Sequence, residues 1–402
     1  MNSKLVLVIN CGSSSLKFAL YTVKHYLLME GLAESLNSEQ AKLHIKQFFH
    51  EECALDAPKK ISRDTQDHAH AIELIITELQ ISFDLDAQLV GIGHRIVHGG
   101  DRFKQSVIIN KQVINEIENC IPLAPLHNPA NLLGISILTT HFPKLDQVAV
   151  FDTSFHQTMP AHAYTYAIPY RFYEKEGVRR YGFHGTSHRF VSLQAAKLLN
   201  KPLQSINLVT AHLGNGASVA AISNGKSVDT SMGMTPLEGL VMGTRSGDID
   251  PGLFDFLISK KITPDNISKI LNKESGLFGI SGISNDMRTL CDKAEQGHER
   301  CLLAIDIFCF RLAKYIAAMM VSLNQFDALV FTGGIGENSA LVREKTIMQL
   351  GIFGFELDLV SNSTKRPDAI ISRPDTKTIL LIATDEEIMI VNDTLELIPG
   401  TY

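Results

Sequence analysis

A short apolar strand that runs directly into a glycine turn is the feature that most constrains the fold of this chain. Residues 4–9, Lys-Leu-Val-Leu-Val-Ile, form a β-branched apolar run typical of a central strand. Residues 10–17, Asn-Cys-Gly-Ser-Ser-Ser-Leu-Lys, follow at once. Because residues 18–21 continue as a second strand, the turn is expected to close a hairpin.

The composition of this turn favours the binding of a polyphosphate. Gly12 lets the backbone turn tightly, three hydroxyls and several backbone N–H groups face the ligand, and Lys17 adds a positive charge. A Walker P-loop is a poor match, since it needs a helix after the turn and the order G-x-x-x-x-G-K-[ST]. An ordinary serine-rich hairpin is the alternative interpretation.

The strand-and-turn arrangement recurs twice later in the chain. The apolar run 206–211 leads into the glycine turn 212–218, and a further strand is expected over 219–222. A third glycine turn, 332–338, follows the strand 328–331. Three glycine turns, each at the end of a β-branched strand, predict two related halves that close on one nucleotide.

Length and periodicity predict an α/β protein of two domains. The chain has 402 residues, which makes two domains the expectation, and strands alternate with helical patterns throughout. We place an N-terminal domain at 1–153 and a nucleotide-binding domain at 154–386, with a C-terminal helix, 387–402, that packs back on the first domain. A strand is predicted over 147–151, and helices are predicted over 69–79, 111–120, 131–141, 187–199, 253–260 and 299–324.

Charge and cysteine usage exclude several classes of partner. The net charge of −6 makes nonspecific binding to nucleic acid or an anionic membrane unlikely on electrostatic grounds. No signal peptide is recognisable, and the apolar stretch 315–321 is too short to span a bilayer. A cytoplasmic enzyme with reduced thiols is therefore expected. No C-x-x-C pair occurs among the six cysteines, Cys11, Cys53, Cys120, Cys291, Cys301 and Cys309.

Two arginines lie between glycines rather than on helical faces, which favours a role in catalysis. Arg95 lies within 93–100 and Arg245 within 239–252. Arginine binds carboxylates and phosphates through paired hydrogen bonds, and phosphoryl transfer needs cations near the equatorial oxygens. His184 could join the two arginines there. Structural salt bridges are the alternative for both arginines.

Two further patterns resemble metal sites but have simpler explanations. His184 and His188 have the i, i+4 spacing of a metal pair, yet no third ligand motif supports zinc. A helix cap at 186–187 and a structural His188 are the favoured interpretation. Asp248 and Asp250 could bind a metal, but the proline after Asp250 also predicts a turn.

At these residues the chain resembles the acetate kinase family across essentially its full length. That family has the fold shared by sugar kinases, actin and the large heat-shock chaperones. The resemblance implies an α/β, two-domain, actin-like or sugar-kinase-type ATPase fold with a duplicated core and an interdomain active-site cleft. The matching segments are 8–17, 180–188, 211–216, 242–248 and 334–338.

The resemblance also implies a role for individual residues. Asn10 and Glu386 match magnesium-associated positions, and Asp385 stands where the family usually has Asn, which could alter magnesium handling. The matching catalytic residues are Arg95, Arg245, His184 and Asp152. The acetate pocket is matched by Arg95, Val97, Leu126, Phe183 and Pro236. The nucleotide-binding positions are Ser13, Ser15, Lys17, His212, Leu213, Gly214, Asn215, Gly216, Asp286, Met287, Arg288, Gly334, Ile335, Gly336, Glu337 and Asn338.

The implied reaction is reversible, in-line phosphoryl transfer from ATP to acetate, giving ADP and acetyl phosphate with Mg²⁺ or Mn²⁺. Acetate is already ionised near pH 7, so it needs no general base. We hypothesise that Arg95 holds its carboxylate, that Arg245 and His184 hold the moving phosphoryl group, and that Asp152 orders magnesium and Arg245. The resemblance also implies a homodimer and a place in acetyl-CoA biosynthesis.

Substrate choice and function class leave alternatives. Propionate kinases share almost every motif but tend to carry a smaller residue at the position of Val97, so acetate is expected to be preferred and propionate tolerated. A sugar kinase would need a polar pocket and a general base, whereas the surroundings of Val97 and Phe183 are apolar. A nucleotide-gated chaperone or filament protein is a further alternative, although a chaperone would need a peptide-binding domain after the core.

Overall fold

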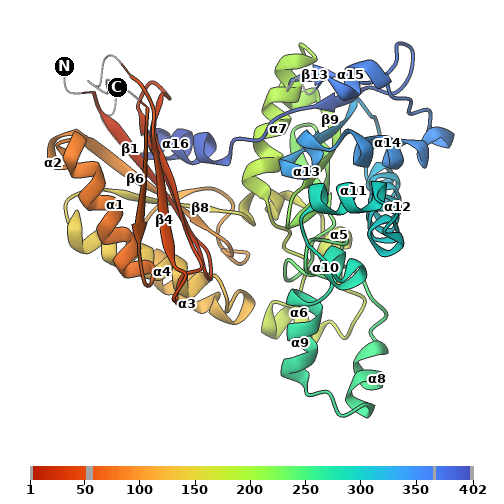
Figure 1. The fold of residues 1–402 in the computed structure, drawn as a ribbon, viewed down its shortest axis with the longest axis horizontal. Coiled ribbons are helices and arrows are strands. Elements are labelled where there is room, and N and C mark those ends of the chain that lie inside the picture. The colour runs from red at the N-terminus through yellow and green to blue at the C-terminus, as the bar shows by residue number, and fades with distance from the viewer. Residues whose placement is uncertain (1–2, 51–57, 365–367, 399–402) are drawn as a thin grey trace. The chain divides into compact units, whose positions relative to one another are not determined.

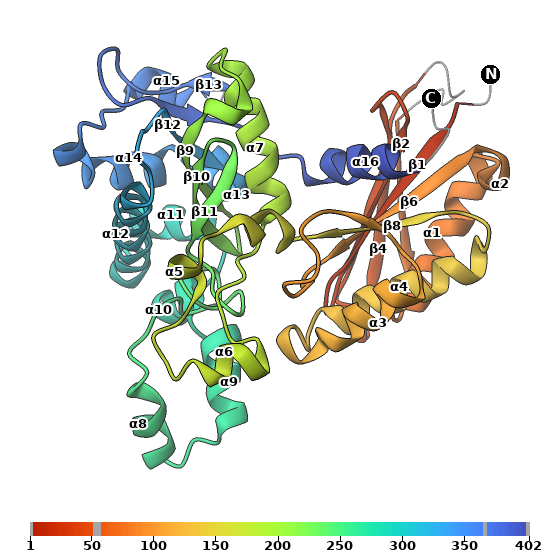
Figure 2. The ribbon, with the colours of Figure 1, turned by 180° about the vertical axis from the view of Figure 1, so that it is seen from behind.

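The computed structural model describes residues 3–50, 58–364 and 368–398, which form two compact units (Figures 1 and 2). The N-terminal unit comprises Met1–Ser154 and Asp385–Tyr402, and the C-terminal unit comprises Phe155–Thr384. Cys53 and residues 399–402 of the predicted C-terminal helix lie outside the described residues. In the described ranges no helix is long and apolar enough to cross a membrane.

The N-terminal unit is built on an eight-stranded mixed sheet with the order β5-β4-β3-β2-β1-β6-β8-β7. Its strands are β1 (Leu5–Cys11), β2 (Leu16–Thr22), β3 (Leu27–Glu34), β4 (Lys42–Gln47), β5 (Lys59–Asp64), β6 (Leu89–Ile96), β7 (Val107–Ile108) and β8 (Gln147–Phe151). Its helices are α1 (His68–Ser82), α2 (Leu85–Gln88), α3 (Lys111–Asn119), α4 (Asn128–His141) and α16 (Glu386–Leu397).

Strand β1 is buried because helices cover both of its faces. Leu5, Leu7 and Ile9 point to one face, where they join a core with residues of α1 and α4. Val6 and Val8 point to the other face and join a core that includes α16. In both ribbon views α16 lies on the opposite side of this sheet from α1 and α4.

The first predicted hairpin is confirmed. Strands β1 and β2 pair antiparallel, with Asn10 opposite Lys17. The turn closes through a hydrogen bond of 2.8 Å from Gly12 N to Ser15 O. The strands β6 and β8 continue the sheet in parallel, so the carboxyl ends of β1, β6 and β8 meet at one edge.

The C-terminal unit is built on a six-stranded sheet with the order β11-β10-β9-β12-β14-β13. Its strands are β9 (Asn207–Leu213), β10 (Ala217–Ser223), β11 (Lys226–Thr230), β12 (Ala328–Thr332), β13 (Ala369–Ile370) and β14 (Ile379–Leu381). Its helices are α5 (Ala161–Tyr164), α6 (Arg171–Glu176), α7 (Gly185–Leu198), α8 (Leu253–Ser259), α9 (Pro264–Lys273), α10 (Gly276–Ser281), α11 (Met287–Glu295), α12 (Glu299–Val321), α13 (Gly333–Asn338), α14 (Ala340–Met348) and α15 (Leu359–Ser363).

Helices also cover this second sheet. Val191 and Ala195 of α7 pack on Leu208 and Val330 of the central strands. Helix α12 contacts β9 and β10. The predicted helices are all present with small shifts at their ends, and the second hairpin, β9 with β10, is confirmed.

The third predicted glycine turn differs from the expectation, because residues 333–338 form the helix α13 rather than a turn. Gly333 has a φ of +77°, which a residue with a side chain rarely adopts, and this lets the chain pass from β12 straight into the helix. The glycines here serve a strand-to-helix junction, and sequence alone did not separate that from a hairpin.

The two sheets repeat one topology. The order β3-β2-β1-β6-β8 in the N-terminal unit corresponds to β11-β10-β9-β12-β14 in the C-terminal unit. In both sets the first two pairings are antiparallel and the next two are parallel. The predicted duplicated α/β core is therefore present.

Candidate active site

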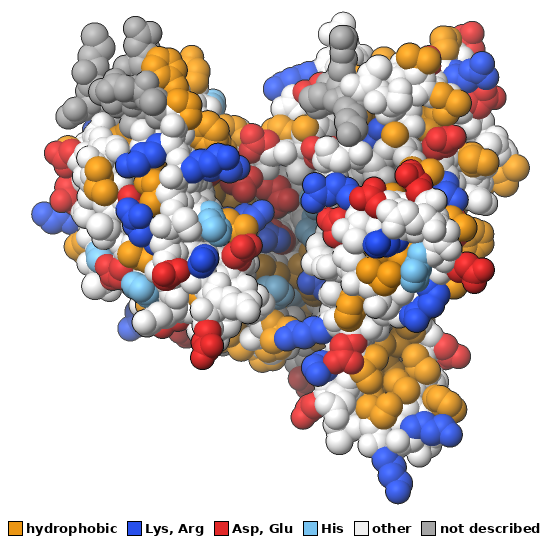
Figure 3. All heavy atoms as spheres, in the orientation of Figure 1, with side chains coloured by type: hydrophobic (Ala, Val, Ile, Leu, Met, Phe, Trp, Pro, Cys, Tyr) orange, Lys and Arg blue, Asp and Glu red, His pale blue; other side chains and the backbone are white. Residues whose placement is uncertain are grey.

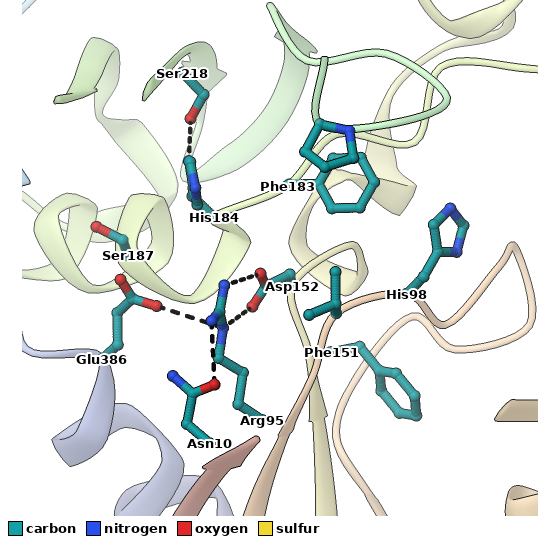
Figure 4. Close-up of polar contacts among 12 residues, drawn as sticks. Asn10, Arg95, His98, Phe151, Asp152, Phe183, His184, Ser187, Ser218 and Glu386 are labelled. Carbon is teal, nitrogen blue, oxygen red and sulfur yellow. Dashed lines mark hydrogen bonds and ion pairs between the residues drawn. The ribbon is translucent and has the colours of Figure 1, made fainter. Parts of the chain in front are cut away.

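In the N-terminal unit, Arg95 and Asp152 form a paired ion bridge at the carboxyl edge of the sheet (Figure 4). Arg95 Nε and Nη2 donate to the two carboxylate oxygens of Asp152 at 2.9 and 2.6 Å. Arg95 lies near the end of β6, and Asp152 directly follows the parallel strand β8, so the sheet brings them together. Burial, the largest single effect, opposes the charge on Arg95, but the carboxylates of Asp152, Glu386 and Glu387 together outweigh it and hold the pKa of Arg95 above its ordinary value.

Asn10 and Glu386 lie beside the same guanidinium group. Arg95 Nη1 donates to Asn10 Oδ1 at 3.2 Å, and Glu386 Oε2 lies 4.0 Å from Arg95 Nε. Burial raises the pKa of Glu386 to about 7; Asp152 and Glu387 add to this effect, and Arg95 opposes it. A cation bound at this carboxylate would favour its ionised form.

The donor set at this edge suits a hard divalent ion. An amide oxygen from Asn10 and a carboxylate from Glu386 are oxygen ligands of the type that Mg²⁺ uses, usually together with waters and substrate phosphates. Within the described residues, no group of three or more His, Cys, Asp or Glu side chains could hold a metal alone. Two protein oxygens would leave most of the coordination shell of such an ion to other ligands.

Asp385, at the position where the resemblance implies an Asn, is the N-cap of α16. Its Oδ1 accepts a hydrogen bond of 2.9 Å from Ile388 N. Asp and Asn are about equally good N-caps. The position therefore has a capping role in this chain, which an Asn would also fill.

The predicted acetate-pocket residues of the N-terminal unit differ in burial. Val97 is buried, and its backbone N–H donates to Asn131 Oδ1 at 3.1 Å, which anchors the segment after β6. Leu126, by contrast, is 54% exposed. In the C-terminal unit, Phe183 is buried and Pro236 is half-buried.

In the C-terminal unit, His184 and Arg245 converge on one glycine. A Cβ atom added to Gly216 would lie 3.2 Å from His184 Nε2 and 3.5 Å from Arg245 Nη1. Arg245 Nη1 also donates to the carbonyl oxygen of Pro236 at 3.2 Å. The glycine turn after β9 thus leaves room for both side chains, and it places an imidazole beside a guanidinium.

His184 is the N-cap residue of α7 and has a left-handed backbone, with a φ of +56°. The predicted cap at Thr186–Ser187 is wrong, because both residues lie inside the first turn of the helix. Ser187 Oγ instead lies 2.8 Å from His212 Nδ1 and 2.7 Å from Thr384 Oγ1. These bonds tie α7 to the ends of β9 and β14.

His156, which sequence reasoning missed, supports the segment that carries His184. Its Nε2 donates to the carbonyl oxygen of Phe183 at 3.0 Å, and its Nδ1 lies 2.7 Å from Ser227 Oγ. Burial lowers the pKa of His156 to about 4, so the ring is neutral and Nδ1 accepts from the serine hydroxyl.

A network around Glu238 holds the loop that carries Pro236, and sequence reasoning missed it as well. Arg180 Nη2 donates to Glu238 Oε1 at 2.5 Å, and the Tyr166 hydroxyl donates to Glu238 Oε2. The Tyr166 oxygen also accepts from Met234 N at 2.9 Å. Only the Arg180 motif was visible in the sequence.

Most predicted nucleotide-binding residues of the C-terminal unit line one cavity of about 950 Å³. Asp286 caps α11 through a bond of 2.9 Å from Thr289 N, and this bond together with the Thr289 hydroxyl and Arg288 lowers the pKa of Asp286 despite some burial. The lining includes Gly214, Asn215, Asp286, Met287, Arg288, Gly334, Ile335 and Asn338.

Other predicted nucleotide residues of this unit have internal partners. Glu337 Oε1 accepts from Gly333 N at 2.9 Å and from Thr384 N at 3.0 Å. Glu337 therefore ties α13 to the end of β14. The remaining members of the set, His212, Leu213, Gly216 and Gly336, lie at the end of β9, in its turn and in α13.

In the N-terminal hairpin, the predicted phosphate-binding side chains are accessible. Ser13 and Lys17 are exposed, and Ser15 is half-buried. His68 Nε2 lies 2.7 Å from the carbonyl oxygen of Gly12, which supports the turn from behind.

The alternative metal patterns resolve into structural roles. His188 is fully buried, and its ring nitrogens lie 2.7 Å from Thr210 Oγ1 and from Ser218 Oγ. Asp248 accepts from Gly239 N at 2.8 Å and from the Tyr315 hydroxyl, which shapes the loop of Arg245. Asp250 Oδ1 accepts from Gly252 N at 2.9 Å, and this confirms the predicted turn.

Comparisons with known proteins identify relatives over the whole chain. The profile of the Acetokinase family matches residues 5–392. "Acetate kinase" of Chromobacterium violaceum is 52% identical over 402 residues, covering 99% of each chain. A propionate kinase structure from Francisella tularensis superposes with a TM-score of 0.92 at 45% identity, covering 98% of this chain and 100% of that one. The Porphyromonas gingivalis acetate kinase structure gives 0.89 at 43% identity, with 98% and 100% covered.

Proposed function

The chain belongs to the acetokinase family, and from this premise we propose that the Arg95 and His184 clusters carry out its ATP-dependent phosphorylation of acetate. The reaction converts ATP and acetate to ADP and acetyl phosphate, and it is reversible. One observation carries the assignment of roles: Arg95 lies at the sheet edge with a buried carboxylate fixing its orientation.

Arg95 binds the acetate carboxylate in this proposal. A guanidinium has five N–H donors, and the bonds to Asp152 and Asn10 use one on each nitrogen. One N–H remains on each terminal nitrogen, which matches the two oxygens of a carboxylate. Asp152 therefore positions Arg95, and its predicted effect on Arg245 stays a prediction.

Arg245 and His184 stabilise the transferring phosphoryl group. Their convergence on Gly216 gives a cation and a hydrogen-bond donor at one point, where charge develops on the equatorial oxygens. The acetate nucleophile is ionised at neutral pH, so no residue has to remove a proton. Catalysis then rests on in-line positioning and charge neutralisation.

The nucleotide and the metal occupy the remaining predicted positions. The adenosine part of ATP binds in the 950 Å³ cavity, and Ser13, Ser15 and Lys17 bind phosphate oxygens. Asn10 and Glu386 would hold Mg²⁺, which would neutralise negative charge on the phosphate groups.

We propose acetate as the preferred substrate and propionate as a tolerated one. Val97 is buried after β6 and narrows the acyl pocket. One methylene in an apolar pocket is worth about 1–3 kcal/mol of discrimination, so some propionate activity is expected. The relative from Francisella, titled a propionate kinase, keeps that substrate as the second candidate.

Trapping of acyl phosphate with hydroxylamine tests the proposal. The assay compares kcat/KM for acetate and propionate with ATP and Mg²⁺, and again with EDTA. A higher value with acetate, lost with EDTA, is expected. A higher kcat/KM with propionate would instead identify the protein as a propionate kinase. Turnover that continues in EDTA would contradict the proposed metal requirement.

The assembly and location follow from the family resemblance. We propose a cytoplasmic homodimer. Figure 3 shows hydrophobic side chains over α8 and α9, and Phe254, Phe256 and Ile258 of α8 are each at least 44% exposed. Such patches often mark contact surfaces. Light scattering should give twice the 44.4 kDa chain mass.

A further inference from the structure

His184 is the first member of a continuous network of hydrogen bonds in the core of the C-terminal unit. His184 Nδ1 lies 2.9 Å from Ser218 Oγ, and the same oxygen lies 2.7 Å from His188 Nε2 (Figure 4 shows the first contact). His188 Nδ1 in turn lies 2.7 Å from Thr210 Oγ1. Ser218, His188 and Thr210 are each fully buried.

The protons of this hydrogen-bond network can be arranged in only two ways. Burial, with smaller effects from His156 and His212, lowers the pKa of His188 well below its ordinary value, so this ring is neutral and has one donor and one acceptor nitrogen. The single Ser218 proton can go to His188 or to His184. Whichever ring receives it, the other ring must donate to Ser218 Oγ.

Thr210 decides between the two arrangements. Among the described residues, its hydroxyl has His188 Nδ1 as its hydrogen-bond partner. If Thr210 accepted from His188, its own proton would be buried without an acceptor, and unsatisfied buried donors are costly. Thr210 therefore donates to His188 Nδ1. His188 Nε2–H then donates to Ser218, and Ser218 donates to His184 Nδ1.

We propose that Ser218 is a positioning residue that holds His184 as a neutral imidazole with its proton on Nε2, and that His188 and Thr210 enforce this arrangement. Nε2 is the atom that faces the Gly216 site beside Arg245. The inference deepens the proposed function, on which its catalytic consequence rests. His184 thereby donates to the phosphoryl group without needing a second positive charge next to Arg245.

The neighbours of His184 agree with this state. Arg245 Nη1 lies 3.5 Å from the Cβ position at Gly216 that His184 Nε2 also approaches, and the His212 ring lies 4.5 Å from the His184 ring between centroids. A charged His184 would face the Arg245 cation directly. A neutral donor keeps the hydrogen bond and avoids that repulsion.

Nitrogen NMR of the 15N-histidine-labelled wild-type protein tests the inference directly. The His184 signals are identified by their loss in His184→Asn. At neutral pH we expect a lone-pair signal for Nδ1 and a protonated signal for Nε2. A proton on Nδ1, on either the neutral or the charged ring, would overturn the proposal.

Two matched pairs of variants add functional readouts. Ser218→Ala should lower kcat by about tenfold, near 1.4 kcal/mol, while KM for ATP stays within about twofold. Ser223→Ala removes a hydroxyl bond to Asn207 at the far end of the same strand and should leave kcat unchanged. Thr210→Val should give a mixture of His184 tautomers, whereas Thr210→Ser should retain the wild-type signals.

Unchanged kcat and tautomer in Ser218→Ala would overturn the proposal. If Ser218→Ala does not fold, the wild-type NMR spectrum and the spectra of Thr210→Val and Thr210→Ser still test the tautomer assignment. The proposed function fails separately: a wild-type protein with the expected tautomer but no acyl phosphate would contradict the kinase reaction and leave the tautomer assignment standing.

Discussion

The two sheets share one topology, yet their carboxyl edges carry different chemistry. At equivalent positions of the two sheets, the N-terminal unit has three charged side chains and an amide, whereas the C-terminal unit has three hydroxyl groups and a histidine. The equivalent positions are Asn10 and His212, Lys17 and Ser218, Arg95 and Thr332, and Asp152 and Thr384.

The difference teaches that a duplicated backbone constrains where side chains meet but not how they interact. At the N-terminal edge, the buried carboxylate of Asp152 holds Arg95. At the C-terminal edge, the Ser218 hydroxyl holds His184 as part of a hydrogen-bond network. Breaking a buried ion pair costs about 3–5 kcal/mol, because one charge is left uncompensated. Losing a neutral hydrogen bond costs about 1 kcal/mol. The two edges should therefore respond unequally to mutation.

The largest effect should come from the two arginines. Arg245→Ala should lower kcat by about 10³–10⁵, as expected for a residue that stabilises phosphoryl-transfer charge. Arg95→Ala removes the proposed contact with the acetate carboxylate and should strongly lower kcat/KM for acetate. Arg95→Ala should also lower the free energy of unfolding by about 3–5 kcal/mol, because Asp152 is 1% exposed and loses its partner. Urea denaturation measures this cost. Equal free energies of unfolding for Arg95→Ala and Arg245→Ala would contradict the proposed difference between the two edges.

Acid should destabilise both units through buried neutral histidines. Burial lowers the pKa of His94 and of His156 to about 4 each. The unfolded value is about 6.5, so the unfolded state binds more protons between these limits, and stability is lost as pH falls from about 6.5 towards 4. The loss should be about 2 kcal/mol per histidine at pH 5.

Urea denaturation between pH 7 and pH 5 measures this effect. His156→Gln should reduce the dependence of stability on pH, and His94→Gln should do the same in the other unit. His162→Gln, at an exposed position of α5, is the control. An unchanged slope in His156→Gln would contradict the lowered pKa, because the His156 ring would then bind protons equally in the folded and unfolded states.

A smaller effect should appear in substrate preference. If Val97 lines the acyl pocket as proposed, Val97→Ala should raise kcat/KM for propionate relative to acetate by up to about tenfold. The hydroxylamine assay with both acids measures the ratio. An unchanged ratio would mean that the C-terminal residues Phe183 and Pro236 set the pocket size.

The smallest effect should come from the start of α16. Asp385→Asn keeps the N-cap and should change the free energy of unfolding by less than about 0.5 kcal/mol, whereas Asp385→Ala should cost about 1 kcal/mol. Helix α7 starts at His184 without a side-chain cap, so no comparable residue exists there. A large change in the Mg²⁺ requirement of Asp385→Asn would instead give Asp385 a metal role.

Sequence patterns predicted the elements that burial determines. The β1–β2 hairpin and helices such as α12 follow from apolar runs and periodicity, which act locally. Residues 333–338 were misjudged as a turn, because a glycine pair permits both a turn and a strand-to-helix junction. The choice depends on Glu337, whose carboxylate accepts from Gly333 and from the distant Thr384.

Sequence analysis identified only those candidate-site residues that lie in recognisable motifs. Arg95 and His184 stand in glycine-rich segments that are visible in the sequence. Other site residues have hydrogen-bond partners that lie 27 to 58 positions away in the sequence, so no local pattern reveals them. These residues are His156, Ser218 and Glu238. Such partners are set by tertiary packing, which periodicity does not encode.

The return of α16 to the first sheet has a consequence for biosynthesis. Ile390 and Leu395 of α16 cover Val6, Val8 and Val150, which belong to strands made far earlier. During translation this apolar face stays uncovered until the whole C-terminal unit has emerged. Chaperones should therefore stay bound to this face until late in synthesis, and a chain that stalls before residue 386 should be prone to aggregation and degradation.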